Sequence, residues 1–267
     1  MSIGFPTNTV ILILALMLGT GVGSWFILAE SLGQLPLAPQ LKRAWRWGAA
    51  IVLSTWLLAR LALSSNPPGA AVLAIPYSFL SFTFLIVGLL VGILPLLISP
   101  VFRQIIRAAP QTWLVGIHAI RIGGFAWLAL MDLQLLPAEF ALPTGYADMT
   151  VGLLALVMAY LLAKRKPYAR PLVIGWNVLG LLDFVVAVTT AAMYNGPFAA
   201  QLAASGVSLL YFNYVLLIPS FGVPVFGLLH IYSLFQILSP RVGKTKHGVE
   251  EPVQTPVSLG EQRSVHP

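Results

Sequence analysis

The residues best suited to chemistry in this sequence are the few strongly polar side chains inside its long apolar stretches. They are His118, Arg121, Asn177, Asp183 and His230. A guanidinium near the middle of a lipid bilayer costs about 2.5–3.5 kcal/mol even on the lenient insertion scale. A chain that keeps Arg121 in such a place is expected to pair it with an acid.

Arg121 and Asp183 each lie near the centre of an apolar stretch, so the two charges are expected at similar depth. Two unpaired charges cost about 5–7 kcal/mol together on the same scale, and a hydrogen-bonded pair removes much of that cost. His118 precedes Arg121 by three residues and therefore shares a helix face with it. We predict an Arg121–Asp183 pair with His118 beside it.

Two roles fit such a pair, and the sequence leaves both open. In the first, the pair is a structural lock between two helices. In the second, it belongs to a ligand or proton site, because histidine changes its charge near neutral pH and responds to a neighbouring carboxylate. The residues of this candidate site are His118, Arg121, Asp148, Asn177, Asp183 and His230.

Three acidic residues, Asp132, Glu139 and Asp148, gather around the connection that follows the stretch containing Arg121. They form either a mouth that attracts cations or a surface loop whose charge keeps it on one side of the membrane. The segment Leu135–Gly145 is too apolar for an ordinary exposed loop, so we expect it to fold back into the membrane. Pro219 and Pro224 lie within the last apolar stretch and predict a kinked or interrupted helix.

The sequence offers little for a cofactor or a catalytic mechanism. Every lysine lies between apolar stretches or in the tail, which excludes the Schiff base of a retinal protein. Membrane zinc hydrolases of the ceramidase kind need three histidines, whereas only His118 and His230 lie within the apolar stretches. The same two residues are the only pair that could hold a haem, which leaves a redox role as a minor alternative. With no Walker loop, Gly-x-Ser-x-Gly or His-Glu-x-x-His motif, neither a metal site nor an enzyme is expected.

Transmembrane helices are the elements expected to position these residues. The chain is 58% hydrophobic and only 9% charged, whereas soluble domains average about 25% charged residues. About 20 apolar residues cross a membrane as a helix. We predict an all-α bundle over residues 1–238 and a disordered cytoplasmic tail over residues 239–267. The seven predicted spans are Thr9–Ala29, Trp45–Leu63, Tyr77–Ile98, Gln111–Met131, Tyr146–Ala163, Pro171–Met193 and Val215–Leu238.

Basic residues follow the first, third, fifth and seventh predicted spans, with Arg60 as the exception. The positive-inside rule therefore places the amino terminus outside and the carboxyl tail in the cytoplasm. The net charge of +7 is spread over several helix ends rather than gathered in one patch, so nucleic acid is not an expected partner. The expected partners are the lipid bilayer and a small-molecule ligand.

Four segments resemble a group of uncharacterised bacterial integral membrane proteins. They begin at His118-Ala-Ile-Arg, Leu136-Pro-Ala-Glu, Trp176-Asn-Val-Leu and Leu217-Ile-Pro-Ser. The stretch Pro143-Thr-Gly-Tyr-Ala-Asp148 is similar to that group's Pro-Ala-Gly-x-Gly-Asp. The resemblance implies a bacterial inner-membrane protein and brings no activity with it. The function expected from the residues is a small-molecule or proton-coupled carrier, with a non-catalytic membrane subunit or scaffold as the alternative.

Overall fold

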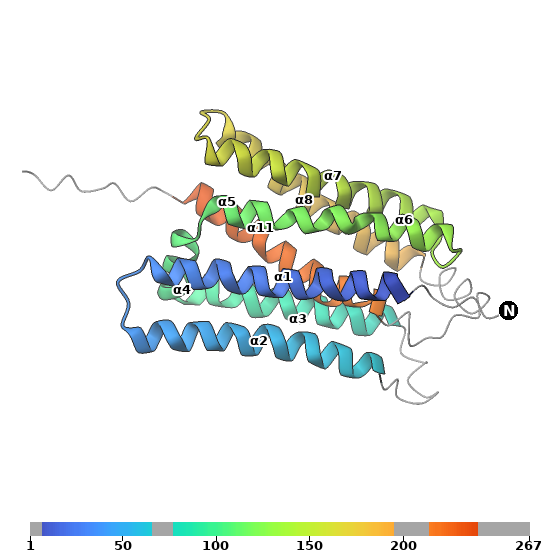
Figure 1. Ribbon diagram of the computed structural model, residues 1–267, viewed down its shortest axis with the longest axis horizontal. Helices are drawn as coiled ribbons and strands as arrows, with labels where there is room; N and C mark the ends of the chain where they lie inside the picture. Colours follow the sequence, from blue (N-terminus) through green and yellow to red (C-terminus); the bar gives the residue numbers. More distant parts are fainter. Residues whose placement is uncertain (1–6, 66–76, 195–213, 240–267) are drawn as a thin grey trace, which may run out of the picture.

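The computed structural model describes residues 7–65, 77–194 and 214–239, and these residues form helices joined by short connections (Figure 1). The α-helices are α1 (Thr7–Gly33), α2 (Pro39–Ser65), α3 (Tyr77–Ile98), α4 (Pro100–Ala108), α5 (Gln111–Gly116), α6 (Phe125–Asp132), α7 (Ala138–Ala163), α8 (Ala169–Met193) and α11 (Val223–Leu238). Two further helical segments are η1 (Ile117–Gly124) and η2 (Ile218–Gly222). The all-α class is confirmed for the described part of the chain. The predicted tail lies outside it, except for Ser239.

The described residues contain six segments long and apolar enough to cross a membrane, so the prediction of seven spans is wrong. The six are Asn8–Gly33, Ser81–Ile98, Gln111–Asp132, Ala138–Ala163, Ala169–Met193 and Ile218–Leu238. The predicted span Trp45–Leu63 is part of α2, which is a continuous helix but not one of the six. Its basic residues make it far less apolar than the other long helices. They are Lys42, Arg43, Arg46 and Arg60.

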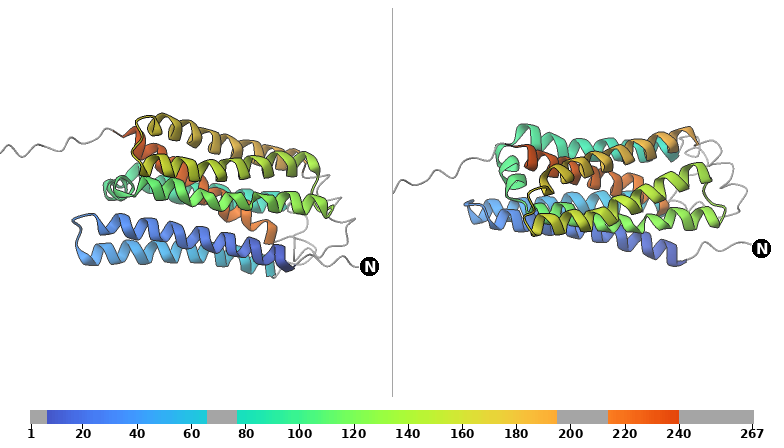
Figure 2. Two further views of the ribbon diagram at one scale, coloured as in Figure 1. Left: turned by 45° about the horizontal axis from the view of Figure 1, so that its top comes forward. Right: turned by 90° about the horizontal axis from the view of Figure 1, so that it is seen from above.

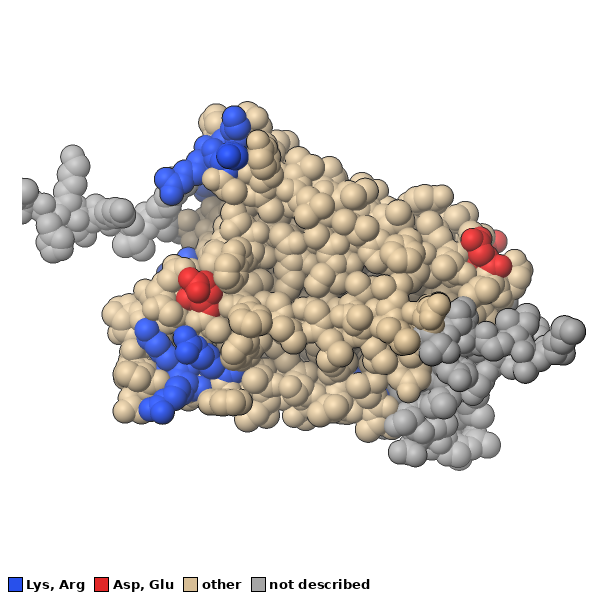
Figure 3. Space-filling model, in the orientation of Figure 1, with Lys and Arg blue, Asp and Glu red and all other residues tan. Residues whose placement is uncertain are grey.

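The long helices run alongside one another, and the chain reverses direction at the two ends of the bundle (Figure 1). Figure 2 shows the hairpin of α1 and α2 as a layer on one side of the molecule. The connections α1–α2, α3–α4 and α7–α8 lie at the same end, and Lys and Arg side chains gather there on the face shown in Figure 3. We call this the basic end.

Helix α7 begins at Ala138 rather than at the predicted Tyr146. Most of the segment Leu135–Gly145, which was expected to fold back into the membrane, is therefore the start of a regular helix with Pro143 inside it. Asp148 lies about 15 Å along the helix axis from Ala138, so its predicted position at an outer mouth is wrong. The apolar character of the segment reflects a longer helix rather than a re-entrant loop.

Two of the candidate spans contain segments that are not α-helical. Helix α5 passes into the 3-10 segment η1 before α6, and the π-helical η2 leads into α11. A 3-10 run longer than three or four residues is uncommon, and π turns within helices are frequent at functional sites. Pro219 lies in η2 and Pro224 at the start of α11, so the predicted interruption of this helix is confirmed.

Side chains of α2 hold the interrupted helix at Ser220. Trp56 Nε1 donates to the Ser220 carbonyl oxygen at 2.8 Å, and Arg60 Nε donates to Ser220 Oγ at 3.1 Å. Pro224 follows Ser220 by four residues and has no N–H to donate to that carbonyl. The indole of Trp56 therefore supplies a hydrogen bond to Ser220 in place of the one that Pro224 cannot donate.

Replacing Trp56 with phenylalanine removes this donor. We expect the free energy of unfolding to fall by about 1–2 kcal/mol, because a buried carbonyl loses its partner. Thermal unfolding of the purified protein in detergent measures the change. Trp47→Phe is the matched control, since Trp47 lies on the same helix and is 69% exposed. An equal loss in both variants would show that the hydrogen bond to Ser220 contributes nothing.

Candidate functional site

Arg121 is the centre of a buried polar network in the middle of the bundle. Its Nε donates to Asp148 Oδ1 at 2.8 Å, and its Nη2 forms a close ion pair with Asp183 Oδ2. The guanidinium also lies over the ring of Phe184, with Cζ 4.2 Å from the centroid. The predicted contact with Asp183 is present, and Asp148 is a second acidic partner.

Two carboxylates thus share one guanidinium, and we call these three residues the triad. Its Arg121 side chain is 2% exposed, the Asp183 side chain 4% and the Asp148 side chain 15%. Asp148 Oδ2 accepts a hydrogen bond from Trp127 Nε1 at 3.0 Å, whereas Asp183 Oδ1 has no partner among the described residues. With both acids ionised, one negative charge is left uncompensated. Because burying a net charge is costly, the triad is suited to take up a proton or another cation.

His230 joins the triad to α8. Its Nε2 lies 3.1 Å from Arg121 Nη1, and a guanidinium only donates, so Nε2 is the acceptor. The other ring nitrogen, Nδ1, then carries the proton and donates to Asn177 Oδ1 at 2.9 Å. The hydrogen-bond network therefore assigns His230 as the neutral Nδ1–H tautomer.

The network continues from Asn177 to the basic end of the molecule. Asn177 Nδ2 donates to Ser233 Oγ at 2.9 Å and to the Val173 carbonyl oxygen at 2.8 Å. Gln111 Nε2, in the first turn of α5, donates to Ser233 Oγ at 2.7 Å. An unbroken series of hydrogen bonds therefore connects Trp127 on α6, through the triad, to Gln111.

His118 lies beside this network without a hydrogen bond to it. Its ring is fully buried, with the centroid 3.9 Å from that of His230 and 5.0 Å from that of Trp176. Neither ring nitrogen of His118 has a partner among the described residues. A haem held by two histidines needs its porphyrin plane between them, and these rings are in contact, so the arrangement does not fit a haem. Within the described part of the chain, no group of three or more His, Asp or Glu side chains is placed to hold a metal.

Glycines let the helices that carry these residues approach closely. A Cβ at Gly152 of α7 would lie 2.5 Å from the backbone nitrogen of Ile122 in η1. A Cβ at Gly124 of η1 would lie 2.5 Å from Asp148 Cβ, and one at Gly180 of α8 would overlap the His230 ring. The absence of side chains at these positions therefore lets the helices that carry the triad and His230 pack closely.

All six candidate residues predicted from the sequence come together at this site, five in the hydrogen-bonded network and His118 in ring contact with His230. The other acids of the predicted mouth, Asp132 and Glu139, lie exposed at the end of α6 and the first turn of α7. The sequence reasoning missed Trp127, Ser233 and Gln111. Ser233 follows His230 by three residues on the same helix face, which is the signal that could have found it.

The fold and the site define a multi-pass helical membrane protein with a buried charge network. Residues 78–238 match the family described as Domain of unknown function (DUF8737). Because the match covers more than half of the sequence, this chain belongs to that family. The matched region contains the whole network, whereas α1 and α2 precede it. Neither the curated proteins nor the solved structures gave a match.

Proposed function

We propose that the protein is a proton-coupled carrier whose proton site is formed by Asp183 and His118 next to Arg121. The charge balance of the buried triad carries this proposal, since one guanidinium faces two carboxylates and His230 is neutral. A single proton neutralises the cluster. Asp183 Oδ1 and both ring nitrogens of His118 have no partner among the described residues, and a neutral imidazole has one acceptor nitrogen, so we infer that these two groups receive the proton.

The irregular helices around the triad support coupling to a conformational change. His118 and Arg121 lie in η1, and η2 leads into the helix that carries His230. Helix α1 lies against both segments, with Gly19 next to the Ile120 side chain and Gly21 next to the Phe221 ring. Carrier sites are typically built where membrane helices are interrupted, and 3-10 stretches within helices often mark hinges.

The proposal includes an orientation. By the positive-inside rule, the basic end faces the cytoplasm and the amino terminus lies outside. In the bacterial inner membrane that the resemblance implies, the network then runs from Trp127 toward the cytoplasmic side at Gln111. Protons would enter and leave along this polar path during the carrier cycle.

A permanent structural lock in a non-catalytic membrane subunit is the second candidate, and the closed contacts favour it. Arg121 is engaged by Asp148, Asp183 and His230 together, and its side chain is 2% exposed. A ligand reaches it only after these contacts open. In a carrier this arrangement is an occluded state, whereas in a scaffold it never opens.

Proton binding distinguishes the two candidates. Infrared difference spectra of the protein in lipid vesicles, recorded across neutral and acidic pH, should show a buried carboxylic acid that forms on acidification. We expect Asp183→Asn to abolish this band, because an amide cannot bind the proton. We expect His118→Gln to change the pH at which the band appears, because the two groups compete for one proton.

Glu139→Gln is the matched control, since this exposed carboxylate on α7 lies outside the network. It should leave the band of the buried acid unchanged. If Asp183→Asn and Glu139→Gln give the same spectra at every pH, Asp183 binds no proton. The triad is then a lock, and the carrier proposal fails.

A further inference from the structure

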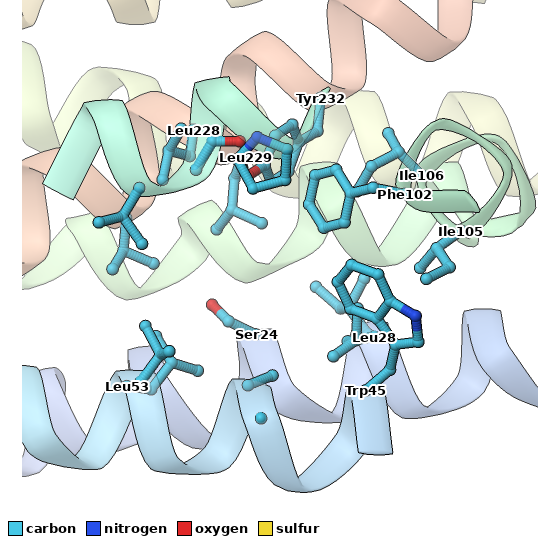
Figure 4. Close-up of a pocket in the computed structure, with 18 of the residues that line it drawn as sticks. Ser24, Leu28, Trp45, Leu53, Phe102, Ile105, Ile106, Leu228, Leu229 and Tyr232 are labelled. Carbon is cyan, nitrogen blue, oxygen red and sulfur yellow. Dashed lines mark hydrogen bonds between the residues drawn. The ribbon is translucent and has the colours of Figure 1, made fainter. Parts of the chain in front are cut away.

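An apolar cavity of about 520 Å³ lies between the α1–α2 hairpin and helices α3, α4 and α11 (Figure 4). Leu53 of α2 lines it on one side and Leu228 of α11 on the other, while Trp45 and Phe102 line one end. Its volume falls within the usual range for ligand sites, about 300–1,000 Å³. No residue of the Arg121 network is among the described residues that line the cavity, so the two sites are separate.

The length of the cavity matches one leaflet of a bilayer. Its lining residues on α2 extend from Ala44 to Trp56, which is about 18 Å along a helix. One leaflet of a hydrocarbon core about 30 Å thick is about 15 Å deep. Val52 and Val91 line the cavity and are 45% and 43% exposed. Neither side chain is fully covered by its neighbours, so the walls that α2 and α3 contribute to the cavity are accessible.

The end of the cavity nearest the α1–α2 connection lies at the basic end of the molecule (Figure 3), although no Lys or Arg is among the described residues that line the cavity itself. Trp45 stacks on Phe102 there with ring centroids 5.6 Å apart, and Lys42, Arg43 and Arg46 flank Trp45 in sequence. Basic pockets between membrane helices are suited to anionic lipid headgroups.

We propose that this cavity binds one acyl chain of an anionic phospholipid from the leaflet at the basic end. The headgroup contacts Lys42 and Arg43 at the basic end. The bound chain fills the space between the α1–α2 hairpin, which precedes the matched family region, and helices α3 and α11. This site is independent of the proton site proposed above.

Native mass spectrometry of the full-length protein tests the proposal, after reconstitution in vesicles of equal parts phosphatidylglycerol and phosphatidylcholine. We expect the wild type to retain phosphatidylglycerol. Gly48 lines the cavity, and a Cβ there meets no atom within 4 Å, so Gly48→Leu can begin its side chain without a clash and extend it into the cavity. We expect this variant to retain about tenfold less phosphatidylglycerol, because the leucine displaces several methylene groups.

Gly175→Leu is the matched control, because Gly175 is also a helical glycine with open space around it but lies on α8, away from the cavity. It should retain lipid like the wild type. Lys42→Gln with Arg43→Gln should reduce the preference for phosphatidylglycerol, whereas Lys164→Gln with Lys166→Gln at the α7–α8 connection should not. Equal lipid loss in both glycine variants, equal retention of the two lipids by the wild type, or a second copy of the chain in place of lipid would overturn the proposal.

Discussion

Replacing Arg121 with leucine is expected to cost about 3–5 kcal/mol of stability, because it leaves buried carboxylates without their cation. Asp148 and Asp183 both depend on this guanidinium, on separate helices α7 and α8. We expect the variant to lose most of its folded, monodisperse material. Size-exclusion chromatography of a fluorescent fusion in mild detergent measures this directly.

Arg107→Leu is the control for removing a cation. Arg107 is exposed and lies over the Phe235 ring rather than between carboxylates. Surface cations contribute little to stability, about 0–1 kcal/mol, so this variant should accumulate like the wild type. Similar losses of folded protein in the two variants would show that the triad contributes no more to stability than a surface cation does.

A variant with an uncharged triad shows whether Arg121→Leu is unstable because two carboxylates are left unpaired or because the fold requires the guanidinium. The variant combines Arg121→Leu with Asp148→Asn and Asp183→Asn, and the amide oxygen introduced on α7 can still accept the hydrogen bond from Trp127. Buried ion pairs are often replaced by uncharged residues without loss of stability. We therefore expect accumulation to recover. If the neutral variant stays as unstable as Arg121→Leu alone, the geometry of the guanidinium, rather than charge balance, holds these helices together.

Depth in the membrane made the Arg121–Asp183 contact predictable from the sequence. Each charge lies near the middle of an apolar stretch. At that depth an unpaired charge is costly, so pairing the two charges is the arrangement of lowest free energy. The position of Asp148 was predicted wrongly because the start of α7 was predicted too late in the sequence. The first turns of α7 contain Glu139 and Pro143, which are residues typical of a loop, whereas Pro143 lies inside the regular helix.

Features that depend on side-chain packing rather than on hydropathy could not be predicted from the sequence. The sequence of the 3-10 segment η1 looks like any other part of an apolar helix, although its backbone lies against Gly152 of α7. Gln111 and Ser233 are uncharged, so the cost of burying a charge does not single them out, and only the spacing of Ser233 from His230 indicates its place in the network. The count of seven spans failed at α2, where Lys42 and Arg60 lie in one helix with an apolar stretch.

Replacing Gly152 with alanine is expected to separate η1 from α7. The new Cβ would lie 2.5 Å from Ile122 N and 2.9 Å from the carbonyl carbon of Arg121. Both are backbone atoms, so relief requires η1 itself to move rather than a side chain to rotate. Overpacking of this kind costs about 3 kcal/mol at the upper end of its usual range. We expect a marked drop in the unfolding temperature measured in detergent.

Gly175→Ala on α8 makes the same chemical change where a Cβ meets no atom within 4 Å. Alanine is the better helix former by about 1 kcal/mol, so this variant should be as stable as the wild type or more stable. The comparison isolates the interface, because both glycines lie within long helices. If Gly152→Ala unfolds at the same temperature as Gly175→Ala, η1 tolerates displacement. Arg121 would then be held by its ion pairs alone rather than by the backbone beneath it.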